Sequence, residues 1–162
     1  MRRPLAALPL LLVAGCGGSS HPAAAPTPSH APAVVKTVPP KPAFAVQTVT
    51  GPTTFSTADH SLSCDVEAAL ARCDVRHSTF TPPAKPSDCH ENWGFGVEYQ
   101  LGTSAGFFCA ADSILGATRV VAVGHGLRVD MVECDVAATG VSCHQVGAHD
   151  GFVVSRSSYR FS

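Results

Sequence analysis

The fold is decided by residues 62–75, which read LSCDVEAALARCDV. Apolar and polar side chains alternate at both ends of this stretch, which indicates two strands that each bury one face. A bridge between Cys64 and Cys73 would pair the strands in a register that places Asp65 opposite Arg72. Both cysteines would then lie on the apolar face, and the Asp65–Arg72 pair would face water. The stretch therefore predicts an antiparallel hairpin stapled by one disulfide.

The same arrangement returns in residues 132–143, which read VECDVAATGVSC. Again eight residues separate the two cysteines, Cys134 and Cys143, and again the first of them opens a Cys-Asp-Val run. Two disulfide-stapled hairpins are therefore expected, and Cys89 and Cys109 are left as the third pair. Six cysteines permit 15 connectivities, so this pairing is an inference from strand register.

The rest of the domain also has the pattern of short strands separated by turns. Glycines and prolines interrupt the sequence about every 8–12 residues, and no ten-residue stretch shows helical periodicity. We expect an all-β domain at residues 53–162, a small sandwich or barrel of about seven to nine short strands. Further strands are expected at 95–101, 105–110, 118–123, 127–133, 151–156 and 158–161, with one helical turn at 112–116 and a turn at Gly124-His125-Gly126.

Residues 1–16, MRRPLAALPLLLVAGC, have the features of an export signal. Two arginines precede an apolar stretch that is too short to span a bilayer. The residues Val13-Ala14-Gly15-Cys16 resemble the lipobox of bacterial lipoproteins, which implies that residues 1–15 are removed and that Cys16 becomes a diacylglyceryl-modified N-terminus. An ordinary secretory signal is the alternative. Without Cys16 an even set of six cysteines remains, as disulfides in an exported domain require.

Residues 16–52 have a different composition from the domain. They contain eight prolines, many alanines and no acidic residue. Such a segment cannot bury enough apolar surface to offset its ordering entropy. We expect a disordered, semi-extended tether that spaces the domain from the membrane. A proline-rich ligand for another protein is the alternative. The boundary is expected between residues 44 and 54, and residues 44–46 could pair with the edge of the domain.

The charge distribution excludes one class of partner. The chain has 11 basic and 12 acidic residues, and the part from Thr53 onward has seven against twelve, a net charge of −5 with neutral histidines. A protein that binds nucleic acid through the phosphates needs a basic face. We therefore expect no nucleic-acid partner. The expected partners are the membrane, through the lipid on Cys16, and an unidentified cell-envelope or protein ligand, with the domain a monomer.

Several short motifs together carry a family resemblance. They are the Cys64–Cys73 hairpin, Cys89 leading into Trp93-Gly94, Cys109-Ala110-Ala111-Asp112, Cys143, and the closing His149-Asp150-Gly151-Phe152 with Ser155-Arg156 behind it. With these motifs, residues 53–162 resemble an uncharacterised domain family of actinobacterial secreted proteins and lipoproteins. The resemblance implies a β-fold, disulfides and export, and it implies no activity.

Four residues are candidates for a ligand surface: Trp93, Phe95, His149 and Arg156. Aromatic rings beside glycines can form an exposed platform for a sugar or a peptide. The alternative for Trp93 is core packing on the Cys89–Cys109 bridge. The alternative for Arg156 is a structural ion pair with an acid such as Asp112.

Two kinds of catalytic or metal site are weaker alternatives. A hydrolytic triad would use Ser155, His149 and either Asp130 or Asp150, but the sequence has no Gly-x-Ser-x-Gly nucleophile elbow. A zinc site would use His144, His149 and a carboxylate, but its ligands lack the close spacing of known zinc motifs. We expect no catalytic residue, no metal and no cofactor. The favoured interpretation is a lipid-anchored protein on the extracytoplasmic face of the cell membrane, whose β-domain is a binding or envelope-interaction module.

Overall fold

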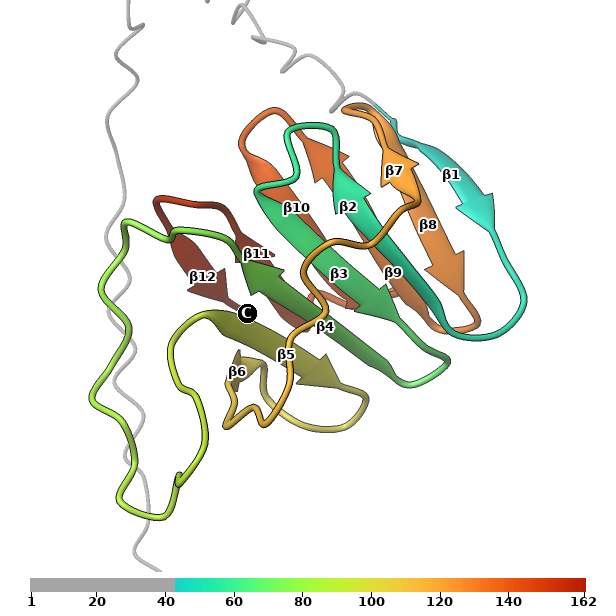
Figure 1. Ribbon diagram of the computed structural model, residues 1–162. Coiled ribbons are helices and arrows are strands. Elements are labelled where there is room, and N and C mark those ends of the chain that lie inside the picture. Colours follow the sequence, from blue (N-terminus) through green and yellow to red (C-terminus); the bar gives the residue numbers. More distant parts are fainter. Residues whose placement is uncertain (1–42) are drawn as a thin grey trace, which may run out of the picture. The chain divides into compact units, whose positions relative to one another are not determined.

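The computed structural model describes residues 43–162, and the expected signal peptide, Cys16 and most of the tether lie outside the described residues. The described part is all-β, with twelve strands where about seven to nine were expected, and two of the twelve contain only two residues each (Figure 1). In chain order they are β1 (Ala45–Thr48), β2 (Thr53–Thr57), β3 (Leu62–Val66), β4 (Leu70–Val75), β5 (Gly96–Gln100), β6 (Gly106–Phe107), β7 (Val120–Val121), β8 (His125–Val129), β9 (Val132–Ala137), β10 (Gly140–Gln145), β11 (Gly151–Val154) and β12 (Tyr159–Phe161).

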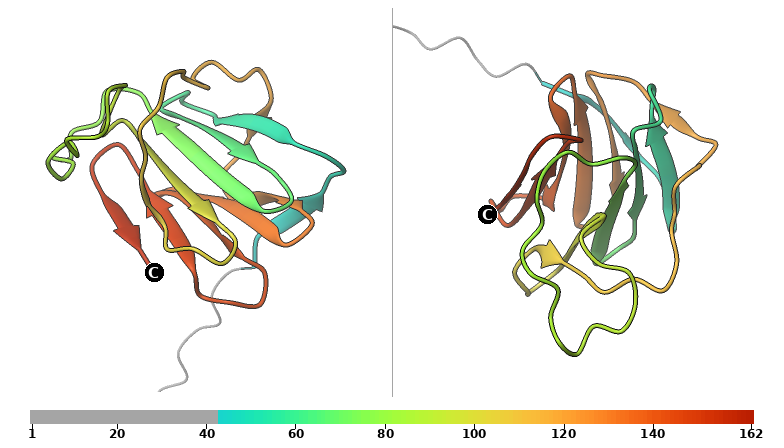
Figure 2. Two further views of the ribbon diagram at one scale, coloured as in Figure 1. Left: turned by 90° about the horizontal axis from the view of Figure 1, so that it is seen from below. Right: turned by 60° about the vertical axis from the view of Figure 1, so that its left-hand side comes forward.

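The strands form two six-stranded sheets that lie face to face as a sandwich (Figure 2). Sheet I has the order β6-β5-β4-β3-β2-β7, and sheet II has the order β1-β8-β9-β10-β11-β12. Neighbouring strands are antiparallel except at one edge of each sheet, where β7 runs parallel to β2 and β1 runs parallel to β8. The pairing of β1 means that the ordered domain begins before residue 53, near the early end of the expected boundary.

The two expected hairpins are present and lie opposite each other across the sandwich. Cys64 pairs with Cys73 in β3–β4, and Cys134 pairs with Cys143 in β9–β10, each as a direct cross-strand pair closed by a disulfide. The sulfur atoms of Cys73 and Cys143 are 3.9 Å apart. The repeated sequence pattern therefore corresponds to two stapled ribbons, one from each sheet, whose sulfur atoms are in contact in the middle of the core.

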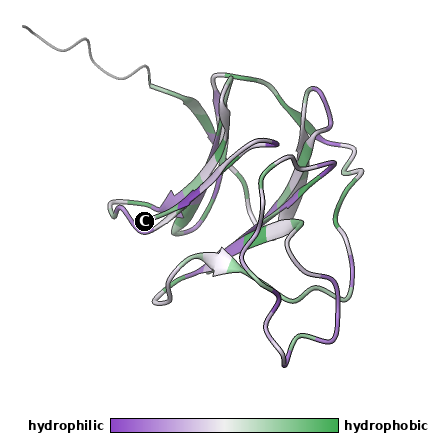
Figure 3. Ribbon diagram, turned by 90° about the vertical axis from the view of Figure 1, so that its left-hand side faces the viewer, coloured by the Kyte–Doolittle hydropathy of each residue, from purple (hydrophilic) through white to green (hydrophobic). Residues whose placement is uncertain are grey.

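The core follows from the period-two pattern of the strands. Inward-facing residues of both sheets are fully or almost fully buried, and hydrophobic and hydrophilic residues are interspersed along the strands (Figure 3). The largest buried side chains are Tyr99, Phe55, Phe152 and Leu127. The third disulfide, Cys89–Cys109, lies outside this core and joins the β4–β5 loop to the segment after β6. Of its two cysteines, Cys109 is exposed to solvent.

Three local expectations were wrong. Residues 112–116 contain no helical turn: a bend and a turn stand there instead. The apolar run at 127–133 is not one strand, because Asp130 adopts a positive φ of 52° and the chain reverses there between β8 and β9. His125 and Gly126 belong to β8, so the turn expected at 124–126 includes only Gly124, which has a φ of 86°.

Candidate functional site

The outer face of sheet I is covered by residues 108–119, which we call the strap. Figure 1 shows this segment running across β5, β4 and β3 towards β7. Its backbone is held by side chains of the sheet: the amide of Ile114 donates to the Asp74 carboxylate at 3.0 Å, and the amide of Gly116 donates to the Ser63 hydroxyl at 3.2 Å. The Ser56 hydroxyl donates to the carbonyl of Ala117 at 2.9 Å. The strap therefore covers a face of sheet I that was expected to be exposed to solvent, and it forms hydrogen bonds with the polar side chains beneath it.

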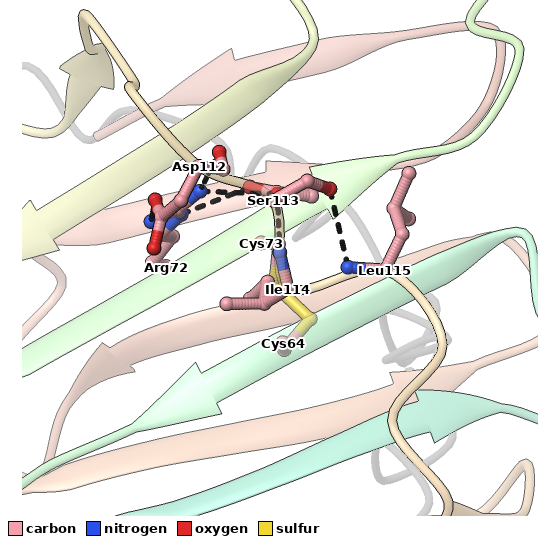
Figure 4. Close-up of polar contacts among 8 residues, drawn as sticks. Cys64, Arg72, Cys73, Asp112, Ser113, Ile114 and Leu115 are labelled. Atoms are coloured by element: carbon pink, nitrogen blue, oxygen red, sulfur yellow. Dashed lines mark hydrogen bonds and ion pairs between the residues drawn. A yellow bond between two sulfur atoms is a disulfide. The ribbon is translucent and has the colours of Figure 1, made fainter.

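One arginine connects the strap to the sheet (Figure 4). Arg72 donates from Nε to the fully buried Asp74 at 3.0 Å, and from its two terminal nitrogens to the side chain and the carbonyl of Asp112 at 2.8 and 2.9 Å. Burial alone would lower the pKa of Arg72, but these hydrogen bonds outweigh it and leave that pKa raised. The hydrogen bond from the Arg72 guanidinium to the Asp112 carboxylate lowers the pKa of Asp112.

This arrangement corrects two expected ion pairs. Asp65 does lie opposite Arg72 in the strand ladder, but the Arg72 guanidinium binds Asp74, two residues further along β4, and Asp112 of the strap. Arg156 is therefore not the partner of Asp112. It donates instead to the carbonyl of His77, with Nε at 3.4 Å, and its own carbonyl accepts from the amide of Thr79 at 2.7 Å.

Five partly buried aromatic residues meet at one side of the sandwich, and we call them the aromatic cluster: Phe80, Trp93, Phe107, Tyr159 and Phe161. Phe107 is at the centre, with ring centroids of the other four between 4.7 and 6.0 Å from its own. It comes from β6, and two of its neighbours come from β12, so the cluster joins the edge strands of both sheets. Tilted and edge-to-face contacts of this kind stabilise an aromatic group beyond simple burial.

Trp93 is neither fully buried nor a free-standing platform. Its indole nitrogen donates to the carbonyl of Pro83 at 2.9 Å, and its ring lies 5.9 Å from that of Phe107. Gly94 makes this position possible, because a Cβ there would lie 2.5 Å from Pro82, and its φ of 84° favours glycine. Trp93 also lines a pocket of about 230 Å³ together with Phe107 and both cysteines of the Cys89–Cys109 bridge.

The four residues expected to form one ligand surface are not brought together. Trp93 lines the pocket at the third disulfide, and Phe95 lines another beside the strap. His149 lines a pocket on sheet II, and Arg156 lines one between the β2–β3 turn and the β9–β10 turn. Of the four, only Trp93 belongs to the aromatic cluster, and the four residues line four different pockets.

The residues of the alternative hydrolytic triad are also apart. His149 precedes β11 and Ser155 follows it, so a four-residue strand, about 13 Å long, separates them. The Ser155 hydroxyl accepts from the amides of Ser157 and Ser158, which fixes it in a tight turn. Asp130 is in the β8–β9 turn. No nucleophile and base meet among these residues.

A second group of ionisable residues lies on the outer face of sheet II. Glu133 and Asp135 are two residues apart on β9, and His144 lies directly opposite Glu133 on β10, with Nε2 to Oε1 at 4.0 Å. The ligand atoms of all three side chains lie within 4.8 Å of one another. His149, the second histidine of the alternative zinc site, lines the same pocket of about 410 Å³ as His144 but is not part of this group.

The sequence contained the signal for this group. The register set by Cys134 and Cys143 places His144 opposite Glu133, and the period of two places Glu133 and Asp135 on one face. The alternative zinc site of His144, His149 and a carboxylate shares only His144 and a carboxylate with this group, because the strand ladder supplies the nearer partners.

Among residues 43–162 no helix is long and apolar enough to cross a membrane. Comparisons of the chain with protein-family models, with curated proteins and with solved structures find no match.

Proposed function

We propose that this chain is an exported lipoprotein whose β-sandwich binds a component of the cell envelope. The export signal and lipobox-like sequence before Cys16 support an anchor on the extracytoplasmic face of the cell membrane. The three disulfides support the same location, because such bonds persist outside the reducing cytosol. Two acyl chains on Cys16 would hold the protein stably, where one chain gives only marginal binding.

The observation that carries the binding function is the aromatic cluster. Its rings are partly exposed, and Trp93 adjoins a pocket whose walls are fixed by the Cys89–Cys109 bridge and by the hydrogen bond to Pro83. A surface that is rigid before binding loses less conformational freedom when a ligand arrives. Aromatic side chains provide much contact area at low entropic cost, which suits a glycan or peptide chain of the envelope. A small hydrolase is less well supported, because His149 and Ser155 stand at opposite ends of β11.

The anchor is tested by the Cys16→Ser variant of the full chain. We expect cell fractionation to find the wild type with the membrane and the variant in the medium, because the variant has no sulfur to acylate. Membrane association that is unchanged in the variant would contradict lipidation.

The binding function is tested with the released full-length Cys16→Ser chain. Wall glycan and envelope protein fractions are each incubated with this chain, and the retained fraction is measured with and without Trp93→Ala. Phe95→Ala is the matched control, since Phe95 is also a partly buried aromatic but lines a different pocket. We expect saturable retention that Trp93→Ala weakens at least about tenfold and Phe95→Ala leaves unchanged. Absence of retention on both fractions, or equal loss in both variants, would refute the proposal.

A further inference from the structure

We propose that Glu133, Asp135 and His144 form a binding site for a divalent transition-metal ion, with Zn²⁺ as the ion that fits best. This inference does not depend on the proposed function, because the site lies on sheet II and includes no residue of the aromatic cluster. It rests on the position of the three side chains in the strand ladder, on their chemistry and on the shape of the sheet beneath them.

The spacing of the ligand atoms is close to that of a metal site. Zinc bonds of about 2.0–2.2 Å in a tetrahedron place neighbouring ligand atoms about 3.3–3.6 Å apart. Here His144 Nε2 and Glu133 Oε1 are 4.0 Å apart, and all three ligand atoms lie within 4.8 Å of one another. Side-chain movements of about 1–1.5 Å would bring the three ligand atoms to this spacing. Three protein ligands leave a fourth position for water or another ligand.

Backbone pairing holds the three residues in place. Glu133 and His144 form a direct cross-strand pair, and the Cys134–Cys143 disulfide bridges the next pair of the same ladder. The site is therefore built on two strands that are covalently joined one residue away from it. Metal sites on strands and helices are held more precisely than those on loops.

The neighbouring strand is shaped to accommodate the Asp135 carboxylate. Gly126 on β8 pairs with Asp135, and a Cβ at position 126 would lie 2.5 Å from Asp135 Oδ1. The absence of a side chain there leaves space for the carboxylate to lie low over the sheet, and Asp135 is only 5% exposed. Glycine weakens the interior of a strand, so its presence here is consistent with a local need for close approach.

The charges and ligand types favour a transition metal over calcium or magnesium. Two carboxylates and a neutral imidazole provide two anionic ligands and one nitrogen ligand for a divalent cation. The nearby Arg128 pairs across strands with Glu133, but its Nε donates to the carbonyl of Asp130 at 3.0 Å. Calcium and magnesium prefer oxygen ligands alone, whereas imidazole nitrogen is a good ligand for zinc.

The test is calorimetric titration of zinc chloride into the full-length, oxidised chain in mild detergent, produced without a histidine tag. The variants are His144→Ala, Glu133→Gln and Asp135→Asn. His149→Ala is the matched control, because it removes an imidazole from the same pocket and leaves the three ligands intact. Circular dichroism and a thiol count that leaves at most Cys16 free establish that each variant is folded with its three disulfides intact. The imidazole resonances of His144 in the wild type provide a second measurement that needs no variant.

We expect one zinc ion per chain and a shift of the His144 resonances on addition of zinc. We expect His144→Ala to weaken binding by at least about a hundredfold, because even groups that only support ligands contribute about 10–100-fold. Each carboxylate variant should weaken binding about tenfold or more, and His149→Ala should change it less than twofold. The proposal is overturned if the wild type shows no saturable binding up to millimolar zinc, if His144→Ala binds as the wild type does, or if His149→Ala loses as much affinity as His144→Ala.

Discussion

The two stapled hairpins both bury their inner face in the core, but their outer faces differ: one is covered by the strap and the other is partly exposed. In β3–β4 the position after the second cysteine is Asp74, which is fully buried under the strap and bound to Arg72 and to the amide of Ile114. In β9–β10 the corresponding position is His144, whose side chain keeps 30% of its surface exposed. The disulfide and the alternating apolar residues specify the ribbon, and the outward-facing residues are free to serve either stability or binding.

The largest expected effect is a difference in unfolding free energy between substitutions on these two outer faces. Asp74→Ala should lower the free energy of unfolding by about 3 kcal/mol, because it leaves the partly buried Arg72 guanidinium without its innermost partner. His144→Ala should lower it by less than about 1 kcal/mol, as is usual for a surface position. Denaturant unfolding of both variants measures the difference. Similar losses in the two would show that the comparison between the hairpins is wrong.

The next effect tests whether the two staples are equivalent. Each closes a loop of the same length, with a sequence separation of 9. Removing either bridge by a double Cys→Ala substitution should therefore cost about 2.7 kcal/mol by the loop-entropy relation. The measurement is the unfolding free energy of the two double variants under oxidising conditions. A loss concentrated in one hairpin would mean that the two ribbons do not contribute alike.

The smallest effect concerns pH and is confined to the strap. Because Arg72 lowers the pKa of Asp112 below its ordinary value of 3.8, the stabilisation from this pair is complete above pH 3.8 and is lost as the pH falls through the lowered pKa. Hydrogen exchange of the Ile114 amide should therefore accelerate in that acidic range, relative to exchange of β9 amides. Asp112→Asn should remove most of this extra dependence. An Ile114 profile that is the same in wild type and variant would disprove the link.

What the sequence could predict was the face of each ribbon that points inward. The alternation of residues and the paired cysteines specify register, and register specifies which side chains share a face. The partner of Arg72 could not be found in this way, because Asp112 is forty residues away on a segment without regular structure. Because this segment is not a strand, no alternation in the sequence indicates which face of the sheet Asp112 approaches.

Turn positions show a second limit. The run 127–133 has the pattern of one continuous strand, because the reversal at Asp130 and Met131 lacks the Asn-Gly or Asp-Gly pair that marks most two-residue hairpins. In the structure Asp130, rather than a glycine, adopts the positive φ of this turn. Of Glu133, Asp135 and His144, the alternative zinc site names only His144, because the other two are placed beside it by the strand ladder and not by closeness along the chain.

The third disulfide differs from the other two in its exposure to solvent, so the three bonds should not respond alike to a thiol reductant. The four cysteines of the hairpins are 0% exposed, whereas Cys109 is open to solvent. Thiol exchange needs an accessible sulfur, so mild reduction attacks Cys89–Cys109 first. The loop that carries Trp93 then loses its covalent link to Cys109 while both hairpin disulfides stay closed, so the aromatic surface would loosen without unfolding of the sheets.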